Sequence, residues 1–312
     1  MSVAERENRE AHSREIALVG LGAMGLPMAL NLLAAGHRVT SRSGDAGRTA
    51  RFAQAGGVVG ASWAEVLEGA DVVITVLPDG GVVRDLIDRP DGVAQHVPSG
   101  ALMIDMSTTS PADARSVGAR CAQLGIDFID APVSGGVTGA EAGTLSIMVG
   151  GREAELERAR PVLEAMGASI THVGPLGSGQ VAKAANQLLV GSTLTALGEA
   201  ILLLERSGVD PAVALEALTG GLAGTRILEA KGAKVIDREF SPTFTTRLHA
   251  KDMAIVRAAA QDAGCVLPVA DRVNEVFAVA IANGLNEQDH SAVVRVAELL
   301  SGTHPTDWSK EP

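Results

Sequence analysis

Residues 16–25 read Ile-Ala-Leu-Val-Gly-Leu-Gly-Ala-Met-Gly. A short apolar strand is followed at once by G-x-G-x-x-G and then by a helix-forming segment, which is the context that a dinucleotide-binding turn requires. Gly20 permits the tight turn, Gly22 lets backbone N–H groups approach a pyrophosphate, and Gly25 lets the helix pack close to the strand. The whole turn is a predicted cofactor-binding site: Gly20, Leu21, Gly22, Ala23, Met24 and Gly25.

Outward from this turn, short apolar strands alternate with helical segments as far as residue 176, and then the strands stop. Alternation of this kind builds a parallel, doubly wound sheet. We therefore expect an α/β Rossmann domain over residues 15–176, followed by an all-α domain over 177–302 that opens with a long interdomain helix near 180–207. Residues 1–14 are predicted to be a disordered extension and 303–312 a tail. A Ser-Pro or Asp-Pro pair predicts an N-cap at Ser110 and at Asp210, and Ser62 begins a capping-box pattern.

The composition limits the class of protein. The 312 residues carry a net charge of −11, with 46% hydrophobic and 20% charged residues. This balance predicts a folded protein that does not bind nucleic acid. The polar N-terminal segment lacks the apolar core of a signal peptide, and the apolar run near 184–204 is interrupted by polar residues, so we expect a cytoplasmic protein without a membrane span. Cys121 and Cys265 are expected to be reduced and buried, and the histidine spacing predicts no metal site.

The end of the second strand addresses the choice between NAD and NADP. An acidic residue there binds the ribose 2′-hydroxyl of NAD, whereas arginine accommodates the 2′-phosphate of NADP. The sequence has Ser41, Arg42 and Ser43, a guanidinium with two hydroxyls, and this favours NADP(H). In the alternative, Arg42 faces solvent and Asp45 binds the ribose. Further strand ends, at Leu77, Pro78 and Thr108, lie where doubly wound sheets contact the nucleotide.

Lys183 is the only lysine or arginine between Arg160 and Arg206, and the helix that follows it is almost entirely apolar or small. A buried ammonium loses its water and therefore requires a partner or a function. Burial also lowers the pKa of an ammonium toward neutrality, which suits a proton donor and acceptor. In the alternative, the side chain reaches solvent near the start of the helix.

Four ordered motifs resemble the β-hydroxyacid dehydrogenases, the family that includes 3-hydroxyisobutyrate dehydrogenase and 6-phosphogluconate dehydrogenase. They are the turn at Gly20–Ala29, the segment Asp130-Ala-Pro-Val-Ser-Gly-Gly136, the segment Gly177-x-Gly-x-x-x-Lys183 and the pair Lys251-Asp252. The C-terminal half looks most like the tartronate semialdehyde (2-hydroxy-3-oxopropionate) reductases of this family. The resemblance extends over nearly the whole chain.

The resemblance implies an NAD(P)-dependent oxidoreductase of small β-hydroxy acids, and most closely the reduction of tartronate semialdehyde to glycerate. It makes Lys183 the general acid, Asn186 its partner, and Ser134, Gly135 and Gly136 the substrate carboxylate site. It also places Lys251 on the cofactor side and implies a homodimer or homotetramer. Many members carry asparagine where this chain has Gln187, so the amide role is assigned to Asn186.

Several alternatives remain open at this stage. The same family includes 3-hydroxyisobutyrate dehydrogenase and glyoxylate/succinic semialdehyde reductases, whose substrates are also small acids. More distant alternatives are an imine reductase, in which the lysine is usually replaced, and a non-catalytic NADP-binding scaffold. Lys183 and the Ser-Gly-Gly segment at 134–136 argue against the imine reductase, and the intact Lys183 argues against the scaffold.

Overall fold

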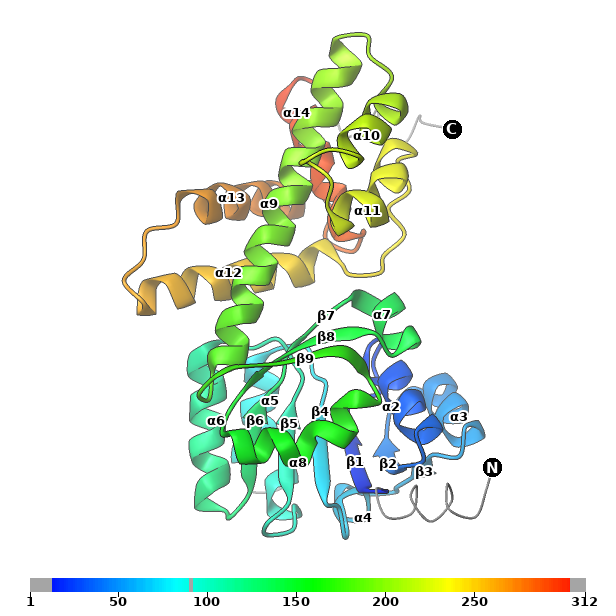
Figure 1. The fold of residues 1–312 in the computed structure, drawn as a ribbon, viewed down its shortest axis with the longest axis vertical. Helices are drawn as coiled ribbons and strands as arrows, with labels where there is room; N and C mark the ends of the chain where they lie inside the picture. The colour runs from blue at the N-terminus through cyan, green and yellow to red at the C-terminus, as the bar shows by residue number, and fades with distance from the viewer. Residues whose placement is uncertain (1–12, 90–91, 304–312) are drawn as a thin grey trace. The chain divides into compact units, whose positions relative to one another are not determined.

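A computed structural model of the protein describes residues 13–89 and 92–303. The predicted N-terminal extension and C-terminal tail fall almost wholly outside this part. The chain divides into two compact units, residues 1–183 and 184–312 (Figure 1).

The first unit is built on one sheet of nine strands within the described residues, in the order β3-β2-β1-β4-β5-β6-β8-β7, with β9 paired to β8. From β3 to β6 every neighbouring pair is parallel, whereas β8 runs antiparallel to β6 and to β7. The strands are β1 Glu15–Val19, β2 Arg38–Arg42, β3 Val58–Val59, β4 Val72–Thr75, β5 Leu102–Asp105, β6 Asp127–Asp130, β7 Val133–Ser134, β8 Leu145–Gly150 and β9 Gly167–Gly174. The predicted doubly wound α/β architecture is confirmed.

Helices connect these strands: α2 Gly25–Ala34, α3 Ala46–Gln54, α4 Trp63–Leu67, α5 Gly80–Asp88, a 3₁₀ turn at Val93–Gln95, α6 Pro111–Gln123, α7 Gly136–Ala142 and α8 Glu153–Glu164. Ser62 and Ser110 cap α4 and α6 through their side chains, as predicted. The helix α3 was not predicted, and its N-cap is Asp45, whose carboxylate accepts the backbone N–H of Arg48.

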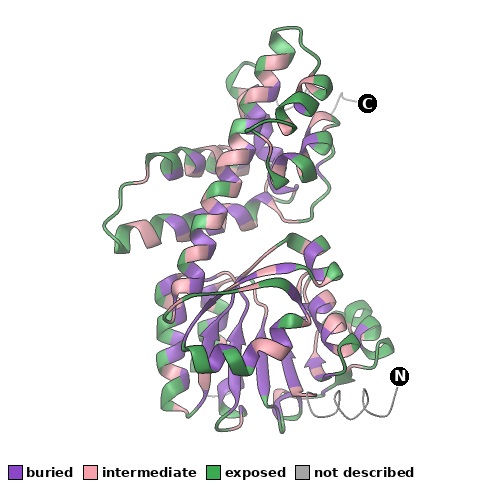
Figure 2. Ribbon diagram, in the orientation of Figure 1, coloured by how far each residue is buried: buried purple, intermediate pink, exposed green. Residues whose placement is uncertain are grey.

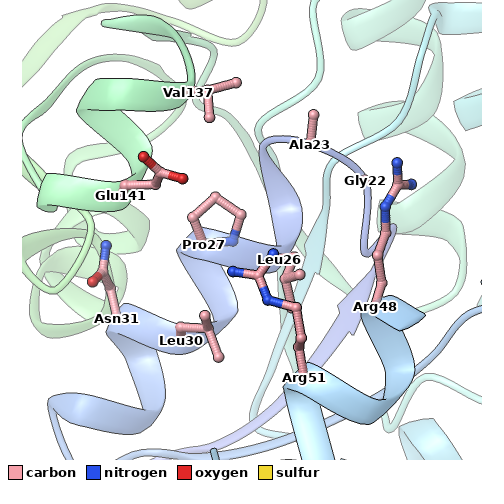
Figure 3. Close-up of a pocket in the computed structure, with 10 residues that line it drawn as sticks. All are labelled: Gly22, Ala23, Leu26, Pro27, Leu30, Asn31, Arg48, Arg51, Val137 and Glu141. Carbon is pink, nitrogen blue, oxygen red and sulfur yellow. The ribbon is translucent and has the colours of Figure 1, made fainter. Parts of the chain in front are cut away.

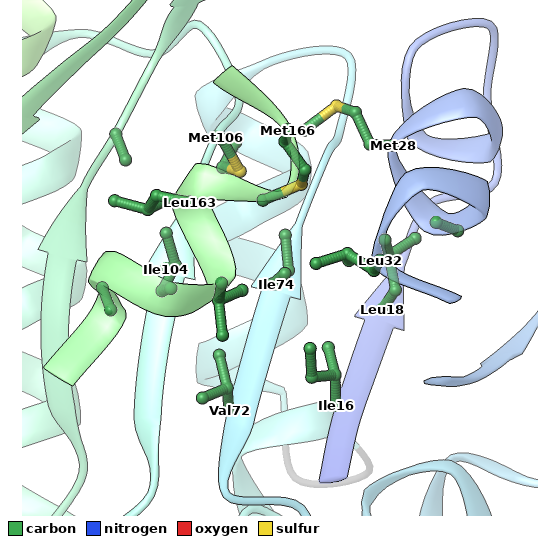
Figure 4. Packing of buried hydrophobic residues seen from close by; sticks show 14 of the residues in the cluster. Ile16, Leu18, Met28, Leu32, Val72, Ile74, Ile104, Met106, Leu163 and Met166 are labelled. Carbon is green, nitrogen blue, oxygen red and sulfur yellow. The ribbon is translucent and has the colours of Figure 1, made fainter. Parts of the chain in front are cut away.

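Alternation along the strands gives the sheet two apolar faces. Ile16, Leu18 and Ile74 pack with α2 and α8 on one face (Figure 4), while Ala17 and Val73 pack with α4, α5 and α6 on the other. Successive side chains of a strand point to opposite faces, so a strand that is apolar throughout is covered on both sides. The purple interior of the sheet in Figure 2 is this two-sided core.

The second unit is all helical in its described part. It contains most of α9 Ser178–Arg206, then α10 Pro211–Thr219, α11 Arg226–Ile236, α12 Thr246–Asp262, α13 Pro268–Ala282, a 3₁₀ turn at His290–Val294 and α14 Arg295–Leu300. Its core includes Leu194, Leu197 and Ile201 from one face of α9. Asp210 caps α10 as predicted.

Helix α9 has 29 residues and is long and apolar enough to cross a membrane by length and composition alone, with 33% of its most apolar window buried. Its buried face packs into the core of the second unit, which is how a core helix also meets that criterion.

One of the two cysteines differs from the expectation that both are buried. Cys121 is buried, but Cys265 is exposed because it lies in the connection between α12 and α13.

Candidate active site

The glycine turn lies where the strand order reverses, between β1 and β4, which is the position at which doubly wound sheets bind ligands. Gly20 has a φ of +112°, and a Cβ there would lie 2.2 Å from the carbonyl oxygen of Val76. A Cβ on Gly25 would lie 1.9 Å from the carbonyl oxygen of Gly20. A Cβ on Gly22 would meet no atom within 4 Å. The turn is therefore closed on its protein side and open at Gly22, as a pyrophosphate cradle requires.

A cavity of about 370 Å³ adjoins this open position (Figure 3). Arg48 and Arg51 reach it from α3, and Figure 3 shows Arg48 beside Gly22 and Arg51 extending toward the start of α2. Glu141 of α7 supplies an acidic group on the opposite side. The lining residues are Gly22, Ala23, Leu26, Pro27, Leu30, Asn31, Arg48, Arg51, Val137 and Glu141.

The end of β2 is arranged differently from the prediction. The Ser41 hydroxyl is fully buried and donates to the carbonyl oxygen of Leu18 at 2.6 Å, so it supports the β1–β2 pair and has no proton left for a phosphate. Asp45 is occupied as the N-cap of α3, and the Ser43 hydroxyl accepts the Asp45 backbone N–H at 3.1 Å. The Arg42 guanidinium lies 5.5 Å from the ring centre of Trp63, a cation–π contact. The groups that face the cavity come instead from α3.

The loops that follow β4 and β5 are joined by hydrogen bonds. The backbone N–H of Leu77 donates to the Ser107 hydroxyl at 2.9 Å. Asp105, buried at the end of β5, accepts from the Thr75 hydroxyl at 2.8 Å and from the Ser107 N–H at 3.1 Å. Burial raises the pKa of Asp105 to about 6. These bonds fix the segments that carry the predicted cofactor contacts: Leu77 and Thr108, which are half-buried, and Pro78, which is exposed.

Asp130, at the end of β6, anchors the first turn of α9. Its two carboxylate oxygens accept the backbone N–H groups of Gly177 at 2.7 Å and Gln180 at 2.8 Å. Burial raises the pKa of Asp130 to about 6. The fully buried Gln180 side chain accepts the Thr109 N–H at 3.0 Å and donates to the Ser107 carbonyl at 2.9 Å. Two polar side chains thus fix the start of α9 against the ends of β5 and β6.

Lys183 lies one helical turn after Gln180, on the same face of α9. It is only 7% exposed. This burial rules out the alternative in which its side chain extends into open solvent. Because Gln180 contacts the loop after β5, the geometry places Lys183 near the carboxyl end of the sheet, the edge that also carries the glycine turn.

The predicted substrate segment joins β7 to α7. Ser134 pairs with Ser146 of β8 and is half-buried. Gly135 and Gly136 follow with φ of +138° and +62°, conformations that side-chain-bearing residues rarely adopt. A Cβ at Gly136 would meet open space, so its backbone is accessible from that side.

The remaining predicted residues, Asn186 and Lys251, belong to the second unit. Asn186 Nδ2 donates to Gln187 Oε1 at 2.8 Å, and Gln187 Nε2 donates to Asp252 Oδ2 at 2.6 Å. The Lys251 ammonium lies 2.9 Å from Asp252 Oδ1. Hydrogen bonds thus join Asn186 to Asp252 through Gln187, and an ion pair joins Asp252 to Lys251. In the sequence-based prediction, Asp252 appears only as part of the pair with Lys251, and Gln187 has no assigned role.

His249 and His290 are also buried in the second unit, with their Nδ1 atoms 2.8 Å apart. Nε2 of His249 lies 3.2 Å from the carbonyl oxygen of Gln187. That carbonyl can only accept, so Nε2 of His249 carries a proton, and one further proton lies between the two Nδ1 atoms. Among the described residues, no group of three His, Cys, Asp or Glu side chains is arranged to hold a metal ion.

Comparison with known proteins agrees with this geometry. Residues 15–174 match the NAD binding domain of 6-phosphogluconate dehydrogenase, and residues 177–297 match a family described as NAD-binding of NADP-dependent 3-hydroxyisobutyrate dehydrogenase.

Two curated relatives match almost end to end. The 2-hydroxy-3-oxopropionate reductase of Escherichia coli is 39% identical over 92% of this chain and 98% of its own. The NAD-dependent L-serine dehydrogenase of Pseudomonas aeruginosa is 35% identical over 93% of this chain and 99% of its own.

Among solved structures, 3-hydroxyisobutyrate dehydrogenase of Mycobacterium tuberculosis with L-serine aligns with a TM-score of 0.82 and 36% identity, covering 91% of this chain and 98% of that one. The chain belongs to the 3-hydroxyisobutyrate dehydrogenase-like family of β-hydroxyacid dehydrogenases and is an NAD(P)-dependent oxidoreductase acting on CH–OH groups.

Proposed function

We propose that the enzyme reduces tartronate semialdehyde to glycerate, with Lys183 as the proton donor. The observation that carries the proposal is the burial of this single ammonium at 7% exposure, on a helix start that is fixed against the sheet. The similarity to the Escherichia coli reductase supports the choice of substrate. 3-Hydroxyisobutyrate and glyoxylate or succinic semialdehyde are the alternative substrates.

Each residue of the site has one role in the proposed reaction. A bound nicotinamide supplies hydride to the carbonyl carbon and accepts it in the reverse direction. Lys183 protonates the alkoxide oxygen as it forms, and takes that proton back in the oxidative direction. The backbone N–H groups of Gly135 and Gly136, with the Ser134 hydroxyl, receive the substrate carboxylate. Asn186 orients the Lys183 ammonium, and Lys251 binds the cofactor.

We propose NADP(H) as the preferred cofactor, now assigned to the α3 arginines rather than to Ser41. Arg48 and Arg51 line the cavity beside Gly22. Arg48 is paired with Asp45 at 3.5 Å, whereas the Arg51 guanidinium has no hydrogen bond or ion pair among the described residues. In a chain of net charge −11, two guanidinium groups beside a pyrophosphate cradle suit a further phosphate.

Replacing Arg51 tests the preference. Arg51→Ala should lower kcat/KM with NADPH by about 10–100-fold, the scale of a lost charge-assisted hydrogen bond, and leave kcat/KM with NADH nearly unchanged. Arg38→Ala, which removes an exposed arginine from β2, is the control. An unchanged NADPH-to-NADH ratio in Arg51→Ala and Arg48→Ala would show that the 2′-phosphate is read elsewhere.

We also propose a cytoplasmic homodimer or homotetramer. The support is the solvent-exposed apolar surface of α9, where Leu189 and Leu203 are 69% and 68% exposed. Large apolar side chains that one helix leaves open to solvent favour a subunit interface on that helix. Light scattering on the purified chain should give the mass of two or four chains, and a monomer would contradict the proposal.

Steady-state kinetics identifies the substrate. For reduction with NADPH, we expect the highest kcat/KM with tartronate semialdehyde in a panel that includes glyoxylate, succinic semialdehyde and a cyclic imine. For oxidation with NADP⁺, we expect the highest kcat/KM with glycerate in a panel that includes 3-hydroxyisobutyrate and L-serine. A site that hydrogen-bonds the additional hydroxyl should reject the methyl analogue strongly, by about 10⁴-fold, because its polar groups would be left unpaired. A higher kcat/KM with 3-hydroxyisobutyrate would replace the proposed substrate and leave the family reaction in place.

A further inference from the structure

We infer that Asp252 is a positioning residue that fixes the direction of a hydrogen-bond chain and thereby makes Asn186 a hydrogen-bond acceptor for the catalytic lysine. The inference rests on the proposed roles of Lys183, Asn186 and Lys251. It concerns helix α9, which carries both Lys183 and Asn186, and residues of the second unit, and it begins from Asp252, which is 2% exposed.

The carboxylate determines the direction of the first bond. Asp252 forms an ion pair with the Lys251 ammonium, 2.9 Å from Oδ1, and a carboxylate in an ion pair has acceptor oxygens only. The group of Gln187 that lies 2.6 Å from Asp252 Oδ2 must therefore be its NH₂. The assignment of nitrogen and oxygen in this side-chain amide follows from the chemistry of its partner.

The orientation of the Gln187 amide in turn determines the orientation of the Asn186 amide. Because the Gln187 NH₂ faces Asp252, its Oε1 faces Asn186, and an oxygen can only accept. The Asn186 group 2.8 Å away must be Nδ2. The carbonyl oxygen of the Asn186 amide is thus the atom left for the active site, one helical turn after Lys183 on α9.

The backbone of Gln187 is held independently. Its carbonyl accepts from Nε2 of His249, and the Gln187 side chain is buried to 5% exposure. The negative charge of Asp252 determines which end of the Gln187 side-chain amide faces it. An acceptor beside an ammonium stabilises the charged, proton-donating form and orients its N–H bonds. A reversed amide would present N–H groups to the ammonium and repel it.

Two variants test the inference: one removes the carboxylate at position 252, and the other moves it to position 187. In Asp252→Asn, the new amide can donate to Gln187 Oε1, so Gln187 turns over and Asn186 presents its NH₂. In the double variant Gln187→Glu with Asp252→Asn, the carboxylate moves to position 187, accepts from Asn186 Nδ2 and from Asn at position 252, and restores the direction at Asn186. The number of buried negative charges is unchanged from wild type.

We expect Asp252→Asn to lower kcat for carbonyl reduction by about 10–100-fold, the scale of one hydrogen bond to a charged group. The basic limb of its kcat–pH profile should move to lower pH, because the Lys183 ammonium loses the Asn186 oxygen as its hydrogen-bond acceptor. The double variant should recover kcat to within about threefold of wild type and return the limb to its original pH. Asp262→Asn, an exposed change at the end of the same helix, is the matched control.

A purely structural Asp252 would give a different pattern. The double variant would then be no more active than Asp252→Asn, and the pH limb would stay in place in both, which would overturn the inference. If Asp252→Asn proves too unstable to assay, Gln187→Leu interrupts the chain and keeps the Lys251–Asp252 pair, and it should show the same loss in kcat and the same shift of the limb. A Gln187→Leu enzyme with wild-type kcat and pH profile would also overturn it.

Lys183→Ala, measured in parallel, separates this inference from the proposed function. An active Lys183→Ala enzyme removes the proposed role of the lysine, whatever the other variants do. An inactive Lys183→Ala enzyme with Asp252 and Gln187 variants that behave like wild type removes only the inference about direction.

Discussion

Two alanine substitutions in one turn should separate packing from cofactor binding. A methyl group on Gly25 would lie 1.9 Å from the carbonyl oxygen of Gly20 and 3.4 Å from Cβ of Val76. The nearer atom belongs to the backbone, so no side-chain rotation relieves the contact and the start of α2 must move. Overpacking of this kind costs about 1–3 kcal/mol, which corresponds to a decrease of roughly 2–10 °C in Tm.

Gly22→Ala should behave in the opposite way. Its methyl group would meet no protein atom within 4 Å, so we expect an unchanged Tm. The methyl group would instead enter the space where the pyrophosphate approaches the backbone, and we expect the Kd for NADPH to rise at least ~10-fold, or about 1.4 kcal/mol.

Differential scanning calorimetry and titration with NADPH measure the two effects on the same preparations. Wild-type NADPH affinity in Gly22→Ala would refute the placement of the cofactor at this turn. An undiminished Tm in Gly25→Ala would refute the argument from close packing.

Two buried polar side chains, Ser41 and Asp105, should affect the free energy of unfolding. Ser41→Ala should lower the free energy of unfolding by about 1 kcal/mol, because the Leu18 carbonyl loses its hydroxyl donor, and leave the NADPH-to-NADH ratio of kcat/KM unchanged; a changed ratio would return Ser41 to the cofactor site. Asp105 has its pKa raised to about 6 by burial, so the stability associated with its protonated form is complete below pH 4 and is lost as the pH rises through 6. Urea unfolding of wild type and Asp105→Asn from pH 4 to 7 should therefore show the wild type losing up to ~3 kcal/mol relative to the variant, and parallel curves would contradict the assignment.

The first unit could be predicted well because its signals are local. The glycine pattern follows directly on a strand, and Ser62, Ser110 and Asp210 each lie immediately before the helix that they cap. Helix α3 has a cap of the same kind at Asp45, but Asp45 was considered only as a possible ribose ligand, and Phe52 is the only buried residue of this helix. With α3 missed, Arg48 and Arg51 were not considered, and the sequence-based prediction of NADP(H) rested on Arg42 with Ser41 and Ser43, although the Ser41 hydroxyl donates to the Leu18 carbonyl.

The hydrogen bonds of the polar residues around the site could not be predicted from the sequence, for a different reason. Gln187 and Asp252 are 65 residues apart and meet only through the packing of α12 against α9 in the second unit. Gln180 is fully buried although it is polar, and only the loop after β5 explains why. Asp130 offered one usable signal, an acidic residue at the end of an otherwise apolar strand, which is costly unless N–H donors converge on it.

The proton-transfer role of Lys183 is tested most directly by the rate of a single turnover in Lys183→Ala with NADPH bound beforehand. This measurement isolates the chemical step from cofactor binding and product release. We predict a rate at least ~10²-fold below wild type, with the Kd for NADPH nearly unchanged. A Lys183→Ala enzyme that completes its turnover within tenfold of the wild-type rate would contradict the assignment of this buried ammonium as the general acid.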